Sequence, residues 1–169
     1  NYIFFHLFRG IKKESLKDRK GKLPYSIEGK TLKWILHAAK HGNTFAQQNL
    51  GILYFIGEGV PQDYKLAFKW SIIAAEKGAR KSQNILGIMD EKGYGVLQNY
   101  QSAFKWFTLS AEKGYAMAQS NLGEMYLNGI GVNQNYKLAF KWLNIAAKQR
   151  NPTAMINLGK MYFKGDGIP

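Results

Sequence analysis

The sequence predicts an all-α fold: a right-handed α-solenoid of antiparallel helix pairs that repeat every 36 residues. Trp and the dipeptide Leu-Gly each recur at this interval without insertion, and Gly-x-Gly-Val separates two apolar stretches in each complete period. The recurring positions are Trp34, Trp70, Trp106 and Trp142, and Leu50-Gly51, Leu86-Gly87, Leu122-Gly123 and Leu158-Gly159. Self-similarity at a period of about 20 to 50 residues is the signature of a solenoid, in which each unit buries its apolar face against its neighbours.

The period also divides the chain into units. The complete units are 43–78, 79–114 and 115–150, followed by a half unit at 151–169. We expect residues 24–169 to form one repeat array. Residues 1–23 are expected to form a basic, degenerate capping segment, because Glu14 and Asp18 stand where later units have Leu and Tyr.

The first apolar stretch of each unit predicts a helix. Ala46, Leu50 and Tyr54 are spaced four residues apart, which places them on one helical face. Glycine inside a helix costs roughly 1 kcal/mol relative to alanine. Its recurrence after Leu50 and the equivalent leucines therefore predicts two helices that lie too close for a methyl group. Asp90 occupies the Tyr slot of the second unit. We expect that helix end to turn outward and expose the carboxylate, because burying a charge without a partner is costly.

The second stretch predicts a helix with defined ends. Each copy begins at a good N-cap residue, namely Asp63, Asn99 or Asn135. Gly78 and Gly114 supply the left-handed residue that follows the first two copies. The third unit has Arg150 at that slot, and we expect the neighbouring Asn151 to be the left-handed residue instead. The Gly-x-Gly segments are expected to be turns, because they follow no strand and lack the Lys-Ser/Thr of a phosphate-binding P-loop.

These residues resemble the Sel1-like repeat, a relative of the tetratricopeptide repeat. The pattern Ala-x-x-x-Leu-Gly-x-x-Tyr-x-x-Gly-x-Gly-Val, then a capped helix with Ala-x-x-Trp, is matched most clearly by residues 46–78 and 118–147. The resemblance implies a non-enzymatic scaffold or adaptor that binds other proteins, a kind of protein often found in bacteria. A cytoplasmic and a secreted bacterial protein are both compatible with it, so no localisation is predicted.

The partner is expected to be another protein, with a peptide or helix bound in the concave groove that the first helices line. Elimination of the core face leaves four slots in each complete unit. The candidates are Phe45, Gln48, Ile52 and Phe55; Lys81, Asn84, Ile88 and Glu91; and Met117, Ser120, Glu124 and Leu127. Apolar anchors within a polar surround are typical of recognition surfaces. The alternative is that these residues are scattered surface hydrophobes or contacts between helices. Tyr94 and Ile130, at loop tips, are secondary candidates.

The strongly basic composition suggests an alternative function. The formal net charge is +13, which favours an anionic partner such as nucleic acid or an anionic membrane lipid. The candidate anion-binding residues are Arg9, Lys12, Lys13, Lys17, Arg19, Lys20 and Lys22 near the N-terminus, and the repeated Lys33, Lys69, Lys105 and Lys141. The sequence favours a purely structural role for the repeated lysines, whose aliphatic stems can cover apolar surface while the ammonium groups stay in water.

The sequence supports no catalytic, metal or cofactor site, and we expect no cofactor and no small-molecule substrate. There is no Cys to form a disulfide or a thiolate site. His37 and His41 have the spacing of two metal ligands on a helix, but no suitable third ligand is near them in the sequence. In the half unit, Leu158, Tyr162 and Ile168 lack a second helix to cover them. Self-association through this C-terminal end is therefore a further expectation.

Overall fold

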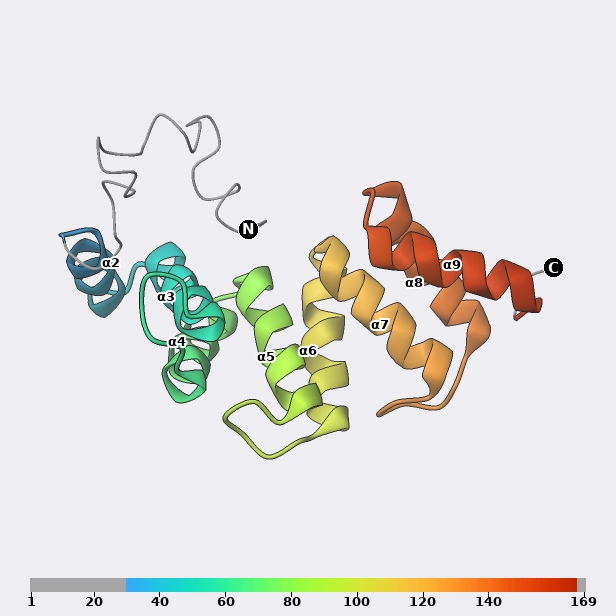
Figure 1. Ribbon diagram of the computed structural model, residues 1–169, viewed down its shortest axis with the longest axis horizontal. Coiled ribbons are helices and arrows are strands. Elements are labelled where there is room, and N and C mark those ends of the chain that lie inside the picture. The colour runs from blue at the N-terminus through green and yellow to red at the C-terminus, as the bar shows by residue number, and fades with distance from the viewer. Residues whose placement is uncertain (1–29, 167–169) are drawn as a thin grey trace, which may run out of the picture.

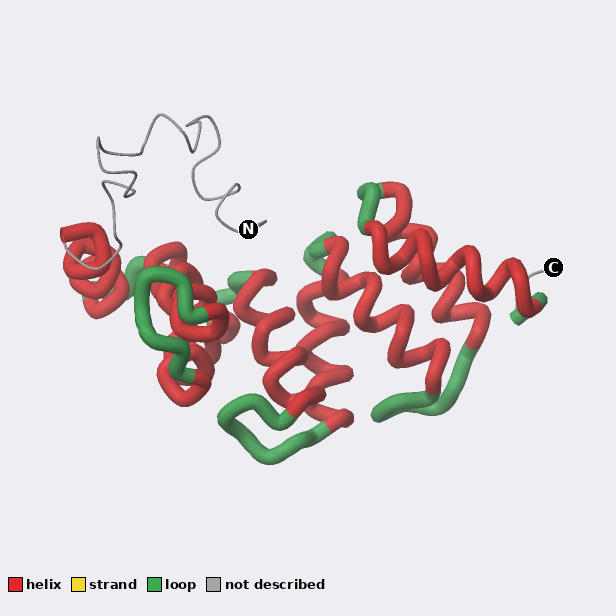
Figure 2. Tube along the Cα trace, in the orientation of Figure 1, coloured by secondary structure: helices red, strands yellow, loops and turns green. Residues whose placement is uncertain are grey.

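The computed structural model describes residues 30–166, and all regular secondary structure in this range is helical (Figures 1 and 2). The helices are α2 (Lys30–Lys40), α3 (Thr44–Ile56), α4 (Tyr64–Glu76), α5 (Arg80–Lys92), α6 (Tyr100–Glu112), α7 (Ala116–Asn128), α8 (Tyr136–Lys148) and α9 (Pro152–Lys164). The all-α solenoid class is confirmed. None of the helices in the described range has the length and apolar character needed to cross a membrane. The predicted capping segment 1–23 and Ile168 lie outside the described residues.

The helices form two layers. The pairs α3–α4, α5–α6 and α7–α8 pack most extensively, and each pair is joined to the next by α4–α5 and α6–α7 contacts. Helix α3 also contacts α5, and α7 contacts α9, whereas α4, α6 and α8 make no comparable contact with one another. In a curved array the inner elements lie closer together than the outer ones. The first helices α3, α5, α7 and α9 therefore form the inner layer of the row seen in Figure 1. The right-handed sense of the array stays a prediction.

The predicted helix caps are confirmed. Asp63, Asn99 and Asn135 are extended N-cap residues whose side-chain oxygens accept from the third following backbone amide at 2.9 Å. This bond satisfies one of the amides that the first helical turn leaves unpaired. Gly78 and Gly114 have φ of 88° and 76°, the left-handed conformation expected of them.

The expectation for the third junction is wrong. Arg150 is the left-handed residue, with φ of 61°, and Asn151 is extended, with φ of −72° and ψ of 117°. Asn151 instead caps α9 by accepting from the Ala154 amide at 2.9 Å. It also precedes Pro152, and a residue before proline is restricted towards extended conformations. These two constraints shift the left-handed position back to Arg150, in register with Gly114.

The helical glycines lie where helices approach closely, as predicted. A Cβ built on Gly87 would lie 2.5 Å from Cε1 of Phe107, and one on Gly123 would lie 2.7 Å from Cγ of Leu143. Gly51 meets Ser71 in the same way. Gly159 is the exception, because no heavy atom lies within 4 Å of a Cβ built there. Gly51, Gly87 and Gly123 therefore mark the points where the first and second helices of one unit are in close contact.

The expectation for Asp90 is also wrong, because its side chain is buried with only 6% of the residue exposed. The hydroxyl of Ser102 donates a hydrogen bond to its carboxylate, which supplies the polar partner that sequence analysis did not identify. Burial raises the pKa of Asp90, and the Ser102 hydrogen bond opposes this shift. In the next unit the same slot holds Tyr126, which packs edge-on against Phe104 with ring centroids 5.5 Å apart.

Candidate protein-binding surface

Four of the twelve predicted groove residues are buried rather than exposed. They are Gln48, Ile52, Asn84 and Ser120, none with more than 9% of its surface accessible. The elimination that selected them considered contacts within one helix pair. It did not include contacts between first helices of successive units.

Those contacts explain the burial. Ile52 of α3 belongs to a core cluster with Ile85 and Met89 of α5. Asn84 of α5 accepts a hydrogen bond from Nδ2 of Asn121 on α7 at 3.1 Å. Ile52 and Asn84 are therefore buried by contacts between the first helices of successive units.

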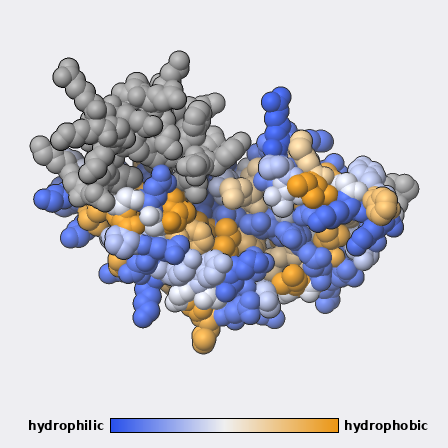
Figure 3. Space-filling model, viewed as in Figure 1, coloured by the Kyte–Doolittle hydropathy of each residue, from blue (hydrophilic) through white to orange (hydrophobic). Residues whose placement is uncertain are grey.

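The candidates nearer the carboxyl ends of the first helices remain accessible. Glu124 is exposed, and Phe55, Ile88, Glu91 and Leu127 are partly exposed. They form the accessible part of the predicted groove. Figure 3 shows that hydrophobic residues on the visible face are interspersed with hydrophilic ones rather than forming one continuous patch.

Aromatic side chains cluster at the α3 end of this surface. Tyr94, one of the secondary candidates, is 38% exposed. Its ring stacks on Tyr64 with centroids 4.9 Å apart, and Phe55 lies 5.7 Å from Tyr64 and 6.2 Å from Tyr94. The loop tip after α5 therefore extends the apolar surface of α3, as a binding role for Tyr94 would require.

A cavity of about 390 Å³ lies at the other end, between α7, the α7–α8 loop, the start of α8 and α9. It includes two predicted residues, Glu124 and Leu127. Its lining residues are Glu124, Leu127, Asn128, Gln134, Tyr136, Asn157, Lys160, Met161, Lys164 and Asp166. The wall thus combines apolar side chains with charges of both signs and amide groups.

The sequence shows why this hollow forms between α7 and α9. Tyr94, Ile130 and Asp166 occupy equivalent positions, 36 residues apart, after α5, α7 and α9. Tyr94 stacks on Tyr64, and Ile130 packs against the core cluster of its unit. Asp166 is shorter and charged, and it lines the cavity instead.

Sequence analysis missed the α9 side of the cavity. Lys160 and Lys164 lie 36 residues after Glu124 and Asn128. The repeat period could have found them, but the elimination stopped at the complete units. Asn157 is 6% exposed, and its Nδ2 has no hydrogen-bond partner among the described residues.

The three remaining groove candidates lie at the beginnings of first helices. Phe45 is 65% exposed and Met117 is 48% exposed, while Lys81 is partly exposed. They are set apart along each helix from the accessible residues of the groove. The structure therefore divides the twelve candidates into a buried group, a carboxyl-end group and an amino-end group.

The candidate anion-binding residues are only partly described. Arg9, Lys12, Lys13, Lys17, Arg19, Lys20 and Lys22 lie outside the described residues. Lys33, Lys69, Lys105 and Lys141 are exposed, at equivalent positions on the second helices. Nζ of Lys141 lies 5.8 Å from the ring centroid of Trp142, within the range of a cation–π contact.

The histidine pair is local to α2 and the turn after it. The rings of His37 and His41 stack with centroids 4.1 Å apart, and Nδ1 of His41 lies 2.8 Å from the His37 carbonyl oxygen. Within residues 30–166, no group of three or more His, Cys, Asp or Glu side chains could hold a metal ion.

Comparison with known proteins identifies the repeat. The Sel1 repeat family model matches four consecutive segments, residues 44–78, 80–115, 116–151 and 152–169. No curated protein matches the chain at a significant level. Among solved structures, a protective antigen of uropathogenic Escherichia coli with an SLR fold is 41% identical, with a TM-score of 0.77 over 81% of this chain. A Sel1 repeat protein from Oxalobacter formigenes is 36% identical, with a TM-score of 0.69 over 76% of this chain.

The chain spans 29% of the length of the Escherichia coli antigen and 53% of that of the Oxalobacter protein. Cysteine-rich protein B of Helicobacter pylori, at 19% identity and a TM-score of 0.58 over 88% of this chain, shares the fold alone. The matched segments follow the 36-residue period and together cover well over half of the sequence. The chain belongs to the Sel1 repeat family.

Proposed function

We propose that this chain is a non-enzymatic scaffold that binds a peptide or helix of another protein on its inner layer. The cavity between α7 and α9 is the anchoring point. This cavity, of about 390 Å³, is the observation that carries the proposal. Binding sites are concave and carry polar groups that fix the orientation of the bound segment. Seven of the ten lining residues are polar or charged, Glu124 and Lys160 among them, and Leu127, Tyr136 and Met161 supply the apolar part of the wall.

The family supports the general part of the proposal. Sel1 repeats generally serve as protein–protein interaction scaffolds. The three solved relatives described above are bacterial proteins, and the Escherichia coli protein is a protective antigen. A binding role for this chain is consistent with that family, while its partner and the use of the groove are part of the proposal.

The accessible inner surface changes character along the array. At the α3–α5 end it presents Phe55, Ile88 and Tyr94 beside Glu91, and at the α7–α9 end it presents Glu124 and Lys160 beside Leu127. A partner segment that fits the whole surface has mainly apolar residues at one end and both charged and apolar residues at the other. Buried aromatic and aliphatic anchors contribute most of the affinity of such interfaces.

Peptide selection followed by mutation of the cavity tests the proposal. The full chain is used to select peptides from a displayed random library, and their affinity is measured by fluorescence anisotropy. The cavity variant combines Glu124→Lys, Lys160→Glu and Leu127→Ala. We expect it to weaken binding at least about tenfold, which corresponds to roughly 1.4 kcal/mol.

The matched control places the same charge exchange on the outer layer. Lys105→Glu with Glu112→Lys on α6 alters two exposed side chains away from the cavity and should leave the affinity unchanged. Circular dichroism checks that both variants remain helical. The proposal fails if no peptide is selected, or if the control weakens binding as much as the cavity variant.

A further inference from the structure

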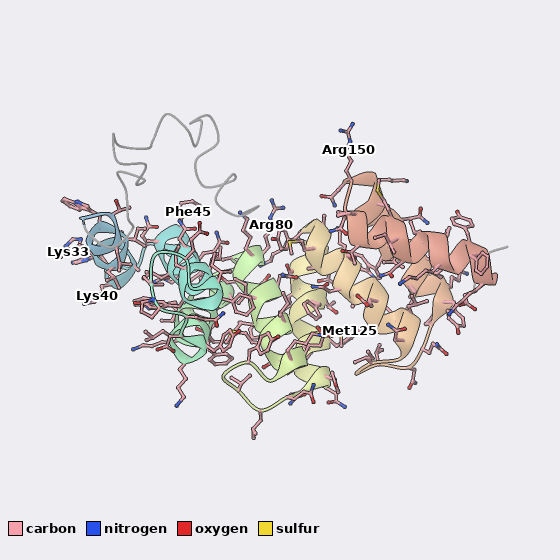
Figure 4. All side chains as sticks on the ribbon, viewed as in Figure 1. Lys33, Lys40, Phe45, Arg80, Met125 and Arg150 are labelled. Atoms are coloured by element: carbon pink, nitrogen blue, oxygen red, sulfur yellow. The ribbon has the colours of Figure 1, made fainter. Side chains whose placement is uncertain are left out.

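A second exposed surface lies at the junctions between units. We call it the junction edge and define it by Phe45, Lys81, Met117, Lys148 and Arg150. The first three occupy equivalent positions at the beginnings of α3, α5 and α7, whereas Lys148 ends α8 and Arg150 lies in the turn before α9. In Figure 4 the labelled Phe45, Arg80 and Arg150 lie along the upper side of the molecule, where successive units join.

Among residues 30–166, Lys81, Lys148 and Arg150 have no anionic partner. Within the described residues the only ion pair joins Lys92 to Glu91, and no side-chain hydrogen bond is formed by Lys81, Lys148 or Arg150. Neighbouring junction cations behave differently: Nζ of Lys77, for example, donates to the Gly42 carbonyl at 2.9 Å. Within the described range, the charges of Lys81, Lys148 and Arg150 are therefore not used in contacts with other side chains.

The α8–α9 junction departs from the repeat in a way that adds charge. Lys148 stands where the earlier units have Glu76 and Glu112, and Arg150 stands where they have glycine. Arg150 adopts a φ of 61° and is the only non-glycine residue with positive φ in the described range. A left-handed backbone is less favourable for arginine than for glycine, and the Asn151 cap and Pro152 fix it here. Here the strained residue adds an exposed guanidinium beside Lys148.

Exposed apolar side chains accompany these cations. Phe45 is 65% exposed and Met117 is 48% exposed, and each lies on the same repeat position as Lys81. Neither residue lines the α7–α9 cavity. They project from the edge of the array rather than enclosing a space for a peptide.

We propose that the junction edge docks the protein on an anionic phospholipid surface. Clustered Lys and Arg are attracted to the negative surface potential of such a membrane, and apolar side chains beside them can enter the headgroup boundary. Exposed side chains at the edge of the array, outside the α7–α9 cavity, can contact the surface of a bilayer. The N-terminal sequence favours the same partner, because the apolar residues 2–8 precede a basic run, and basic clusters beside apolar segments are typical of binding to anionic lipid.

Vesicle flotation of the full chain tests this proposal. The vesicles contain phosphatidylcholine alone or phosphatidylcholine with phosphatidylserine. The edge variant combines Lys81→Gln, Lys148→Gln and Arg150→Gly, the last of which restores the glycine of the other junctions and relieves the left-handed strain. Each cation near the surface contributes about fivefold to binding, so we expect the edge variant to lower partitioning onto phosphatidylserine vesicles roughly a hundredfold. The variant Phe45→Ser with Met117→Ser should lower partitioning as well.

The control variant Lys65→Gln, Lys105→Gln and Lys137→Gln removes the same net charge from exposed positions of the second helices. It should bind phosphatidylserine vesicles much more tightly than the edge variant does. An equal loss in both variants would show that net charge alone drives binding and would overturn the proposal. The proposal would also be overturned if, at low salt, the wild-type chain bound vesicles with phosphatidylserine no better than vesicles without it. Salt-sensitive binding of an oligonucleotide through the same edge residues, without vesicle binding, would assign the edge to nucleic acid instead.

Discussion

Gly87 and Gly159 occupy the same repeat position but differ in what lies opposite them. A Cβ at Gly87 would lie 2.5 Å from Cε1 of Phe107, which is fully buried, whereas a Cβ at Gly159 would meet no heavy atom within 4 Å. Alanine gains roughly 1 kcal/mol of helix propensity at either site, but overpacking a core costs about 1–3 kcal/mol.

We therefore expect Gly87→Ala to lower the free energy of unfolding by about 1 kcal/mol and Gly159→Ala to raise it by about 0.5–1 kcal/mol. Urea unfolding followed by circular dichroism measures both. Changes of the same sign in the two variants would contradict the close-approach explanation.

The buried carboxyl of Asp90 gives stability a defined pH dependence. Burial raises its pKa above the ordinary 3.8. A carboxyl with a higher pKa in the folded state contributes stability fully below its unfolded pKa and loses that contribution as pH rises through the folded pKa. Asp90→Asn stays uncharged and can still accept from Ser102. It should therefore raise the free energy of unfolding near neutral pH and have little effect in acid below 3.8.

Ser102→Ala provides the opposite test. It removes the hydrogen bond that lowers the Asp90 pKa, so it should destabilise the protein near neutral pH more than in acid. Urea unfolding at several pH values measures both variants. An Asp90→Asn effect that does not change with pH would contradict the role assigned to burial.

At the scale of single helices, local sequence signals predicted the structure well. The 36-residue period located the helices, and the N-cap residues and turn glycines located their ends, because these features depend on bonds within a few residues. The left-handed residue at the α8–α9 junction was misassigned, since the capping role of Asn151 competes with its tolerance for that conformation. Asp90 was misassigned because its partner Ser102 belongs to the next helix.

The binding surface was less predictable than the helices. Helical periodicity separates the face that packs within a pair from the remaining residues, but it does not reveal which of those contact the next unit. Ile52 and Asn84 were therefore expected to be accessible, although they pack between first helices. The α9 side of the cavity was missed for a different reason. Lys160 and Lys164 follow the repeat, but the half unit was left out of the elimination.

The caps of the second helices should contribute measurably to stability. Asn135 accepts from the Leu138 amide at 2.9 Å, and loss of such a cap typically costs about 1 kcal/mol. Asn135→Ala should lower the free energy of unfolding by that amount. Asn133 lies exposed in the same loop, so Asn133→Ala should change stability by less than about 0.5 kcal/mol. Equal effects in chemical unfolding would show that the cap bond does not determine the loss.

At the scale of the whole molecule, the face of α9 departs from the regular stacking of the earlier units. Leu158 is buried against α8, contrary to its expected exposure, but Tyr162 is exposed as expected. Ile156 is 60% exposed and Phe163 is 93% exposed. The equivalent positions in α3, α5 and α7 are buried or partly buried.

A helix placed over this face should stabilise the array. Appending a copy of residues 134–150 after Pro169 continues the 36-residue period. The position equivalent to Phe163 stays partly exposed in the complete units, whereas the position equivalent to Ile156 is buried in all three. Burial of Ile156 would contribute about 1.5–3 kcal/mol, and 1 kcal/mol shifts Tm by roughly 2–4 °C in a domain of this size. We expect Tm to rise by roughly 5 °C. The same copy carrying Ala139→Glu and Leu143→Glu, which removes its apolar face, should give no increase, and equal gains from both would contradict the prediction.

The same exposed face should promote self-association. Sedimentation velocity over a range of concentrations should show reversible association of the unextended chain, because exposed apolar surface at the end of a solenoid favours contact with another molecule. Phe163→Glu should shift the chain towards the monomer. A strictly monomeric unextended chain at high concentration would contradict this expectation.

The two layers of the array give it directional stiffness. Consecutive first helices touch along the inner side, where α3 meets α5 and α7 meets α9, while the second helices do not make comparable contacts with one another. Bending that opens the array must separate packed side chains of α3 from α5 and of α7 from α9. A change in the spacing of the second helices breaks fewer contacts. The array therefore resists bending mainly through the contacts between first helices on its inner side. A ligand that bridges several first helices would add to that side and fix the curvature, so the distance between the two ends of the array would report on its occupancy.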